Sequence, residues 1–377
     1  MEFRLERDVF ADAVAWAARS LPIRPSVPVL AGLVIEANSG KLVISGFDYE
    51  VSARVEIDAD VPSQGKALVS GRLLADISRN LPDRPVQVTT EETKVVLTCG
   101  GARFTLLTLP LEDYPVLPEM PSSAGSVMGG VFATAVSQVA IAAVRDDTLP
   151  VLTGIRMEIE GENLTLAATD RYRLAVRELT WTPEQTEVSA VALVPARTLA
   201  DSAKSLAGNA DNAITIALAT TGAGEGMMGF AGNGRRTTSR LLEGEFPKYR
   251  ALLPTEYSAT ATVATQSFVE AIKRVALVAE RNTPIRLAFS ASELVIEAGS
   301  KDEAQACEGL GVTLEGEDIA IAFNPAFLLD GLDAIDAPVT HLSFTSSTTP
   351  AVITGKASAE AETSSEYRYL VMPVRLS

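Results

Sequence analysis

The residues best placed to do chemistry in this chain are cations that recur at matching places of a repeated pattern. Arg72 and Arg79 are seven residues apart, as are Arg197 and Lys204, so each pair would lie on one face of a helix. Cations at regular intervals suit the repeated phosphates of a nucleic-acid duplex. One such pair would usually be a solvated helix charge, but the recurrence favours a shared basic surface.

Three further cations extend this predicted DNA-contact set. Arg24 follows the first predicted helix, and the first helix of the third repeat supplies Lys273 and Arg274. The segments lack aromatic residues that would stack on single-stranded bases, and they show no helix-turn-helix or zinc-finger spacing. We therefore expect contacts to the backbone of duplex DNA, without sequence preference.

The net charge of the chain must be reconciled with a DNA-contacting surface. A formal charge of −16 over 377 residues would repel phosphates if it were spread evenly. Screening acts over about 8 Å at physiological salt, so a basic inner surface can attract DNA while a distant acidic exterior limits nonspecific binding. The position of the cations therefore matters more than their sum.

Acidic residues offer a competing, catalytic interpretation. Asp48 and Asp170 occupy matching places in the first two repeats, and a carboxylate pair can act as acid and base in a hydrolase. Recurrence in each copy favours a local role instead, such as turn capping. The single histidine, His341, has no accompanying serine elbow or cysteine pair, and no phosphate-binding or dinucleotide fingerprint occurs. We expect no catalytic residue, metal or cofactor; a hydrolase and a peptide-binding scaffold without DNA remain the alternatives.

The elements that position these residues form a threefold repeat. A helix with buried apolar spacing is predicted from Phe10, from Phe132 and from Phe268, each followed by alternating strands and a second helix. The apolar positions of the three first helices are Phe10, Val14, Ala17 and Leu21; Phe132, Val136, Val139 and Ala143; and Phe268, Ile272, Val275 and Ala279. The repeat far exceeds the roughly 20–50 residues of a solenoid unit, so each copy is expected to be a domain.

The predicted fold class is α+β, with three similar domains that each pack two helices on antiparallel sheet. Small polar stretches that read as linkers place the domains at residues 1–125, 126–254 and 255–377. Cys99 and Cys307 are expected to be reduced, buried thiols. A membrane-length apolar segment and an N-terminal signal are both missing from the sequence, so a cytoplasmic location is expected.

Five motifs, in this order and spacing, resemble the bacterial DNA polymerase III sliding clamp (beta subunit) family over the whole chain. They are Arg24-Pro-Ser-Val-Pro-Val-Leu, Ala168-Thr-Asp-Arg-Tyr-Arg-Leu-Ala, Glu245-Phe-Pro-Lys-Tyr-Arg, Phe323-Asn-Pro-Ala-Phe-Leu-Leu-Asp and Tyr369-Leu-Val-Met-Pro-Val-Arg-Leu. The resemblance implies a noncatalytic processivity factor. Two chains would join head to tail into a closed ring of six domains around duplex DNA and tether the replicative polymerase.

The resemblance also implies a pocket between the second and third domains that takes a short peptide motif with Gln and large apolar residues. Its partners would be the polymerase alpha subunit, the clamp loader, other polymerases and repair proteins, with no membrane contact. Arg171-Tyr172 departs from the Gly-His of many members, Lys248 from Asp, and Asn282 from an aromatic residue. The matching pocket residues are Leu152, Thr169, Arg171, Arg173, Leu174, Pro247, Leu252, Asn324, Phe327, Val371, Met372, Pro373, Val374, Arg375 and Leu376.

The family's dimer joint lies between the first domain of one chain and the third domain of the other. A head-to-tail contact that closes after two copies leaves no free strand edge. The positions that match on the first domain are Arg103, Phe104 and Leu106; on the third domain they are Ala276 and Leu277, with Asp302, Glu303 and Glu308 as the acidic stretch facing Arg103.

Overall fold

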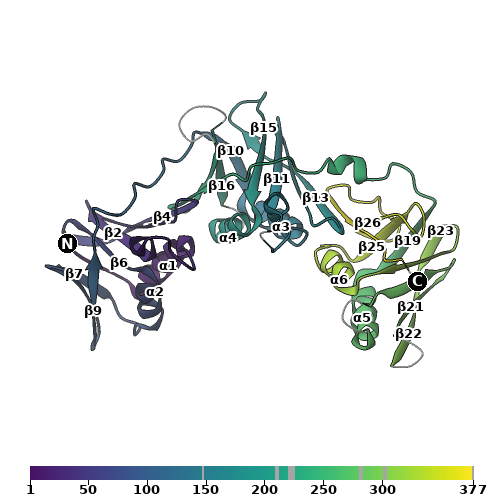
Figure 1. Ribbon diagram of the computed structural model, residues 1–377, viewed down its shortest axis with the longest axis horizontal. Coiled ribbons are helices and arrows are strands. Elements are labelled where there is room, and N and C mark those ends of the chain that lie inside the picture. Colours follow the sequence, from purple (N-terminus) through teal and green to yellow (C-terminus); the bar gives the residue numbers. More distant parts are fainter. Residues whose placement is uncertain (147, 209–211, 220–225, 280–282, 300–303, 376–377) are drawn as a thin grey trace. The chain divides into compact units, whose positions relative to one another are not determined.

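The computed structural model describes the whole chain except residues 147, 209–211, 220–225, 280–282, 300–303 and 376–377. Asn282, Asp302, Glu303 and Leu376 therefore lie outside the described residues, and their predicted roles stay predictions. The described residues form six α-helices in three pairs, as the repeat predicts (Figure 1). The pairs are α1 (Arg7–Ala17) with α2 (Gly71–Asn80), α3 (Gly129–Ala140) with α4 (Ala196–Ala207), and α5 (Thr265–Val275) with α6 (Pro325–Asp333).

The apolar spacing of the first helices predicts their buried faces correctly for about three turns. Phe10, Phe132 and Phe268 are completely buried, and the apolar residues at the next two predicted positions of each helix are buried as well. The fourth predicted positions, at residues 21, 143 and 279, lie beyond the helix ends. Short 3-10 turns (Ala18–Ser20 and Ala276–Val278) end α1 and α5 before those positions are reached.

The chain divides into two compact units, and unit 1 comprises Met1–Gly130, Thr182–Thr186 and Asp201–Leu241. Its strands form one antiparallel sheet, and α1 packs on β3 and β4 beside α2 (Figure 1). In spatial order the described strands are β14 (Thr182–Pro183), β10 (Ser123–Met128), β16 (Ala213–Leu218), β17 (Met227–Gly232), β18 (Arg235–Arg240), β4 (Val51–Asp58), β3 (Lys41–Phe47), β2 (Gly32–Asn38), β6 (Gly65–Ser70), β9 (Ala102–Leu109), β8 (Lys94–Cys99), β7 (Val86–Glu91), β1 (Glu2–Leu5) and β5 (Asp60–Ser63).

Strands β18 and β4 join parts of the first and second repeats into this single sheet. They pair from Arg235↔Val55 to Ser239↔Val51, and the hydroxyls of Ser52 and Thr238 hydrogen-bond at 2.6 Å. The small polar stretch after residue 121, predicted as a linker, is in part strand β10, paired on both sides by β14 and β16. Its Ser and Gly composition resembles a linker, but strand pairing on both sides makes it part of the sheet.

Unit 2 comprises Val131–Trp181, Glu187–Ala200 and Leu242–Ser377. It has two antiparallel sheets, and helices α5 and α6 pack against each other beside them (Figure 1). The first sheet runs β15 (Ser189–Pro195), β11 (Gly154–Glu160), β12 (Asn163–Thr169), β13 (Arg173–Thr180), β27 (Tyr367–Val371), β26 (Ala351–Lys356), β25 (Val339–Phe344), β19 (Ala259–Ala264) and β23 (Thr313–Gly316); the second runs β22 (Gln305–Gly311), β21 (Glu293–Gly299), β20 (Ile285–Phe289) and β24 (Ile319–Phe323).

The two cysteines differ in environment. Cys99 is fully buried, and its thiol donates to the carbonyl oxygens of Pro82 and Arg84 at 3.2 Å. Cys307 is exposed, so its prediction as a buried thiol is wrong. It lies on β22, the edge strand of the smaller sheet, where a strand-like sequence does not ensure burial. Among the helices that the structure describes, none is long and apolar enough to cross a membrane.

Helix α6 lies close to β27 because Gly331 has no side chain. The ring of the completely buried Tyr369 occupies the space that a Cβ at Gly331 would need, and its hydroxyl donates to the Phe327 carbonyl oxygen at 2.7 Å. This close approach fixes the position of Phe327, which belongs to the predicted peptide pocket.

We expect Gly331→Ala to lower the free energy of unfolding by about 1–3 kcal/mol, because the new methyl group must displace a buried ring. Urea unfolding of the full chain measures the loss. Gly311→Ala on β22 is the matched control, since a Cβ there meets no atom within 4 Å. Equal stabilities of the two variants would contradict the packing argument.

Candidate functional site

The turn from Asp170 to Arg173 organises the predicted peptide-binding surface. The Asp170 carboxylate oxygen Oδ1 accepts hydrogen bonds from the backbone N–H groups of Tyr172 and Arg173, both at 3.0 Å. Thr169 is buried and donates through its hydroxyl to the Arg173 carbonyl oxygen at 2.6 Å. Arg171, between them, has a positive φ of 78°. Asp170 and Thr169 therefore shape the turn rather than present free polar groups.

The matching turn of the first repeat is built in the same way. Asp48 Oδ1 accepts from the backbone N–H groups of Glu50 at 2.9 Å and Val51 at 2.6 Å, and Tyr49 has a φ of 76°. The prediction that these recurring aspartates cap turns is thus confirmed.

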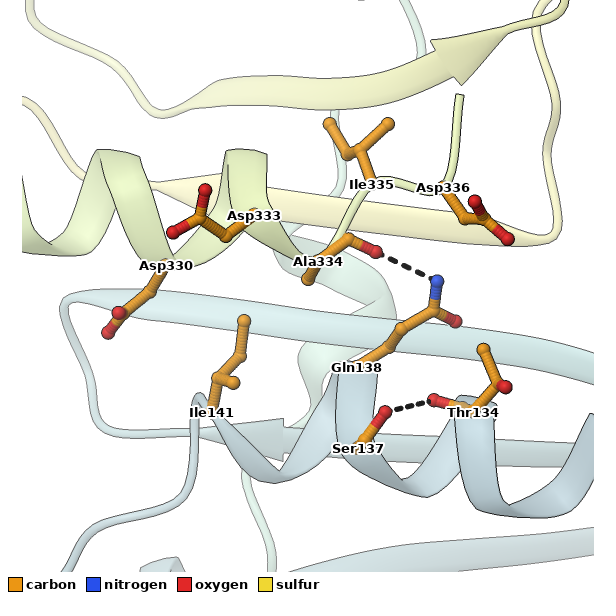
Figure 2. A pocket seen from close by; sticks show the side chains of 9 residues that line it. All are labelled: Thr134, Ser137, Gln138, Ile141, Asp330, Asp333, Ala334, Ile335 and Asp336. Atoms are coloured by element: carbon orange, nitrogen blue, oxygen red, sulfur yellow. Dashed lines mark hydrogen bonds between the residues drawn. The ribbon is translucent and has the colours of Figure 1, made fainter. Parts of the chain in front are cut away.

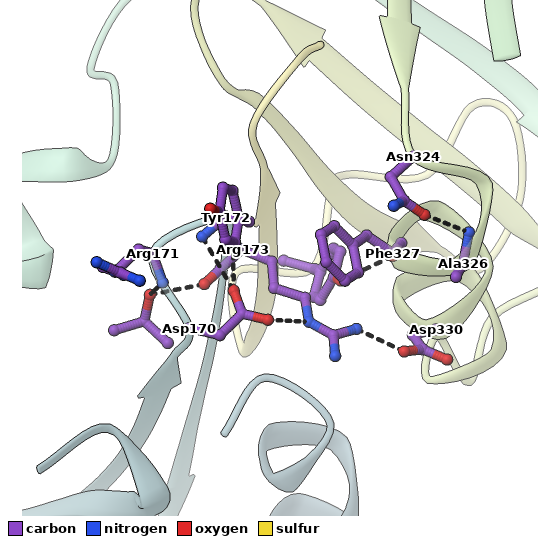
Figure 3. Close-up of polar contacts among 10 residues, drawn as sticks. Asp170, Arg171, Tyr172, Arg173, Asn324, Ala326, Phe327 and Asp330 are labelled. Atoms are coloured by element: carbon purple, nitrogen blue, oxygen red, sulfur yellow. Dashed lines mark hydrogen bonds and ion pairs between the residues drawn. The ribbon is translucent and has the colours of Figure 1, made fainter. Parts of the chain in front are cut away.

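Arg173 links this turn to helix α6 (Figure 3). Its Nε donates to Asp170 Oδ2 at 2.9 Å and its terminal nitrogen to Asp330 Oδ2 at 2.5 Å, while its side chain is only 11% exposed. The guanidinium lies 4.6 Å from the centre of the Phe327 ring, on which Tyr172 also stacks at 6.1 Å. Burial disfavours the charged form, but Tyr369 and the two carboxylates outweigh it and hold the pKa of Arg173 above its usual value. Phe327 is therefore held by a permanent cation and an aromatic ring.

The C-terminal segment runs from β27 along two sheets. Val371 is buried and pairs with Arg173 on β13, and the next residue, Met372, donates its N–H to the Tyr172 carbonyl oxygen at 2.8 Å. Val374 donates to the Ala322 carbonyl oxygen on β24 at 2.8 Å. The side chains of Met372 and Val374 are 39% and 38% exposed. The tail thus presents apolar side chains from a hydrogen-bonded backbone.

An apolar cluster underlies this surface. Leu174 belongs to it, Leu152 is buried nearby in sequence order before β11, and Leu252 is half-exposed. The sequence prediction missed several members, although Phe246 and Tyr249 stood inside the quoted Glu245–Arg250 motif. The buried members are Ala167, Leu174, Val176, Leu193, Phe246, Tyr249, Val352 and Leu370.

Glu158 anchors the segment that carries Tyr249. Its side chain is 8% exposed and accepts from Arg156 Nε at 2.6 Å, the Tyr249 hydroxyl at 3.0 Å and Arg250 at 2.5 Å. Burial raises the pKa of Glu158, but the hydrogen bonds from Arg156, Tyr249 and Arg250 lower it by more, so the net shift is downward. An ionised Glu158 therefore fastens the 3-10 turn Tyr249–Leu252 to β11.

We expect Glu158→Gln to lower the free energy of unfolding at pH 7 by about 1–3 kcal/mol, because three donors lose a charged acceptor. The folded-state pKa lies below the unfolded one, so the unfolded state binds the extra proton and the stabilisation fades as the pH falls below the ordinary value of 4.5. Urea midpoints measured from pH 7 to pH 3 should converge for the two proteins. Glu160→Gln, at a site 64% exposed, is the control; a gap that stays constant with pH would contradict the assignment.

The predicted DNA-contacting cations are all exposed, but they differ in their partners. Within the part of the chain that the structure describes, Arg24, Arg72, Arg79, Arg197 and Lys204 form no ion pair. Lys273 lies 3.5 Å from Asp333, and Arg274 forms a two-bond pair with Glu308 at 2.6 and 3.0 Å. The first five cations are therefore freer to meet phosphates than the last two.

Two strands have free hydrogen-bonding edges. Within the described pairings, residues 102–107 of β9 pair only with β8, and β22 is the end strand of its sheet. Phe104 and Leu107 are 37% and 69% exposed, whereas Leu106 is buried in its own unit. Leu277, in the turn after α5, is 84% exposed. The structure thus adds Leu107 to the accessible residues of the predicted joint and removes Leu106 from them.

His341 has a structural environment on β25. Its Nδ1 lies 3.3 Å from the Thr262 hydroxyl, and burial lowers its pKa, helped by the charge of Lys356. The described residues contain no group of three His, Cys, Asp or Glu side chains that could hold a metal ion.

Three family profiles cover nearly the whole chain: the N-terminal domain of the DNA polymerase III beta subunit matches residues 1–118, the central domain 126–248 and the C-terminal domain 250–375. The chain is 61% identical to the beta sliding clamp of Streptomyces coelicolor (strain ATCC BAA-471 / A3(2) / M145) over 377 residues, all of both chains. It is 51% identical to the beta sliding clamp homolog GriR of Streptomyces muensis over 100% of this chain and 99% of that one. A Pseudomonas aeruginosa sliding clamp bound to griselimycin matches with a TM-score of 0.91 at 27% identity, covering all of both chains.

Proposed function

The chain belongs to the DNA polymerase III beta subunit family, the bacterial sliding clamps, and we propose that two copies form a ring that encircles duplex DNA. It is a processivity factor of the replicative polymerase and a noncatalytic subunit. The hydrolase alternative is thereby set aside, in keeping with the turn-capping carboxylates of Asp48 and Asp170.

The two free strand edges carry the proposal of a ring. Strand β9 of one protomer and β22 of its partner can pair and continue one sheet across the joint, which would cover both edges. Phe104 and Leu107 would meet Ala276 and Leu277 of the other copy, and Arg103 would face the acidic stretch that includes Glu308. Because the contact is head to tail, two copies satisfy both joints.

A ring would hold DNA by topology, so the individual phosphate contacts can be weak. Arg24, Arg72, Arg79, Arg197 and Lys204 supply unpaired exposed cations for these contacts, despite the net charge of −16. Contacts of this kind have no sequence preference, as sliding requires.

We propose that clients bind the surface of Arg173, Phe327 and the C-terminal segment with a short peptide motif. Its exposed apolar side chains beside oriented polar groups suit such a peptide. The clients would be the polymerase alpha subunit, the clamp loader, other polymerases and repair proteins, in the cytoplasm. A tethered polymerase rebinds its primer end as an intramolecular event, which explains processivity.

After loading onto DNA, the protein should stay on nicked circular DNA for much longer than on the same DNA made linear, because only free ends let a ring escape. Gel filtration of the loaded DNA at high salt measures retention. Equal loss from both forms would overturn the ring.

A matched pair of multiple variants separates DNA binding from a peptide scaffold without DNA. Replacing the five unpaired cations by alanine should reduce loading, whereas replacing Lys273 and Arg274, which already have acidic partners, should have a smaller effect. Loading that is unaltered by the first set would favour the scaffold.

A further inference from the structure

Unit 2 has a pocket between the end of α3 and the end of α6 that is separate from the peptide-binding surface (Figure 2). Its volume is about 420 Å³. Helix α3 contributes Gln138, and the chain just after it contributes Ile141; Ile335 and Asp336 follow α6. The pocket therefore combines an apolar wall with polar groups from two helices.

Gln138 is the residue in this pocket that needs a ligand. Its side chain is 7% exposed, and its Nε2 donates to the Ala334 carbonyl oxygen at 2.9 Å, which fixes the orientation of the amide. The amide oxygen Oε1 is buried and has no hydrogen-bond partner. In Figure 2 this oxygen faces the open space that Thr134 and Asp336 border. A buried acceptor without a donor is costly, so a bound donor would be favoured.

The charges around the pocket select a cation. Its lining contains three aspartates and no lysine or arginine. Asp330 is paired with Arg173 and Asp333 with Lys273, but Asp336 forms no ion pair with any described residue. The uncompensated charge therefore lies at Asp336, on the side of the pocket that the Gln138 oxygen faces.

The spacing of the acids argues for an extended organic cation over a metal ion. The described residues contain no three acidic or His/Cys side chains close enough to converge on one ion. A primary ammonium group has three donors and no acceptor, so it matches a lining of oxygen acceptors. The side chains of Ile141 and Ile335 offer apolar surface to a methylene chain.

We propose that this pocket binds an aliphatic diamine or polyamine. One ammonium group donates to Gln138 Oε1 and lies beside the Asp336 carboxylate, and the methylene chain lies along Ile335 toward Ile141. This ligand site is independent of the ring and of the peptide motif.

Titration of putrescine into the full-length protein, followed by calorimetry and by the methyl NMR signals of Ile141 and Ile335, tests the proposal. We expect saturable binding that shifts both methyl signals. Asp336→Asn should weaken it about tenfold, since a charge-assisted contact is lost. Gln138→Met should weaken it as well, and thermal unfolding checks that this variant folds.

Asp318→Asn is the matched control, because it removes the same charge at an exposed site of unit 2 that does not line the pocket. Magnesium chloride at equal ionic strength controls for attraction to the net charge of −16. Equal binding by the Asp336 and Asp318 variants, or the same methyl shifts with magnesium, would show nonspecific attraction and overturn the proposal. Unshifted methyl signals with putrescine would do so too, leaving water as the partner of Gln138.

Discussion

A chain that ends at Met372 is expected to lose the binding of client peptides while it keeps its dimer. The deletion removes Val374, whose backbone is anchored on β24 through Ala322 and whose side chain is partly exposed. Loss of one apolar contact of this size together with a fixed backbone should weaken binding by about 100-fold, or ~2.7 kcal/mol. Fluorescence anisotropy with a labelled peptide that contains Gln and large apolar residues measures the effect.

Two controls separate the tail from the rest of the molecule. Arg375→Ala should bind the peptide nearly as well as the unchanged chain, because the anchored backbone and Val374 remain. The truncated chain should elute as a dimer in size-exclusion chromatography, since the proposed joint uses β9 and β22 instead. Dissociation of the truncated protein would contradict this division of roles, and unchanged peptide affinity would contradict the assignment of the tail.

The repeated local features were predictable from the sequence because each depends on neighbouring residues. The helices from Phe10, Phe132 and Phe268 follow from apolar spacing, and the turns at Asp48 and Asp170 follow from short side chains that bond their own backbone. Family motifs added the peptide surface, where the structure does place Arg173 beside Phe327.

Features that depend on distant residues were not predictable in this way. The pairing of β18 with β4, which makes residues near 123 part of a sheet, joins segments far apart in sequence. Burial of Leu106 and exposure of Leu107 depend on the register of β9, which a family match does not fix. The anchoring of Tyr249 by Glu158 joins β11 to a segment about ninety residues later, and no local pattern marks it.

The joint between protomers gives the second large expected effect. Leu277→Ala should raise the dimer dissociation constant by about 30-fold or more, or ~2 kcal/mol, because a leucine that is exposed in the single chain would be buried against the partner. Size-exclusion chromatography with light scattering over a dilution series measures the change. The weakened ring should also leave circular DNA faster.

Val116→Ala is the matched control for this prediction, because Val116 is 92% exposed and lies outside the proposed joint. A Phe104→Ala variant should resemble Leu277→Ala, since the two side chains would lie on opposite sides of the same contact. Combining Phe104→Ala with Leu277→Ala should cost less than the sum of the single changes if they touch, because each single variant already removes their shared contact. Strict additivity would place the two residues in separate contacts, and an unchanged dissociation constant for Leu277→Ala would remove the turn after α5 from the joint.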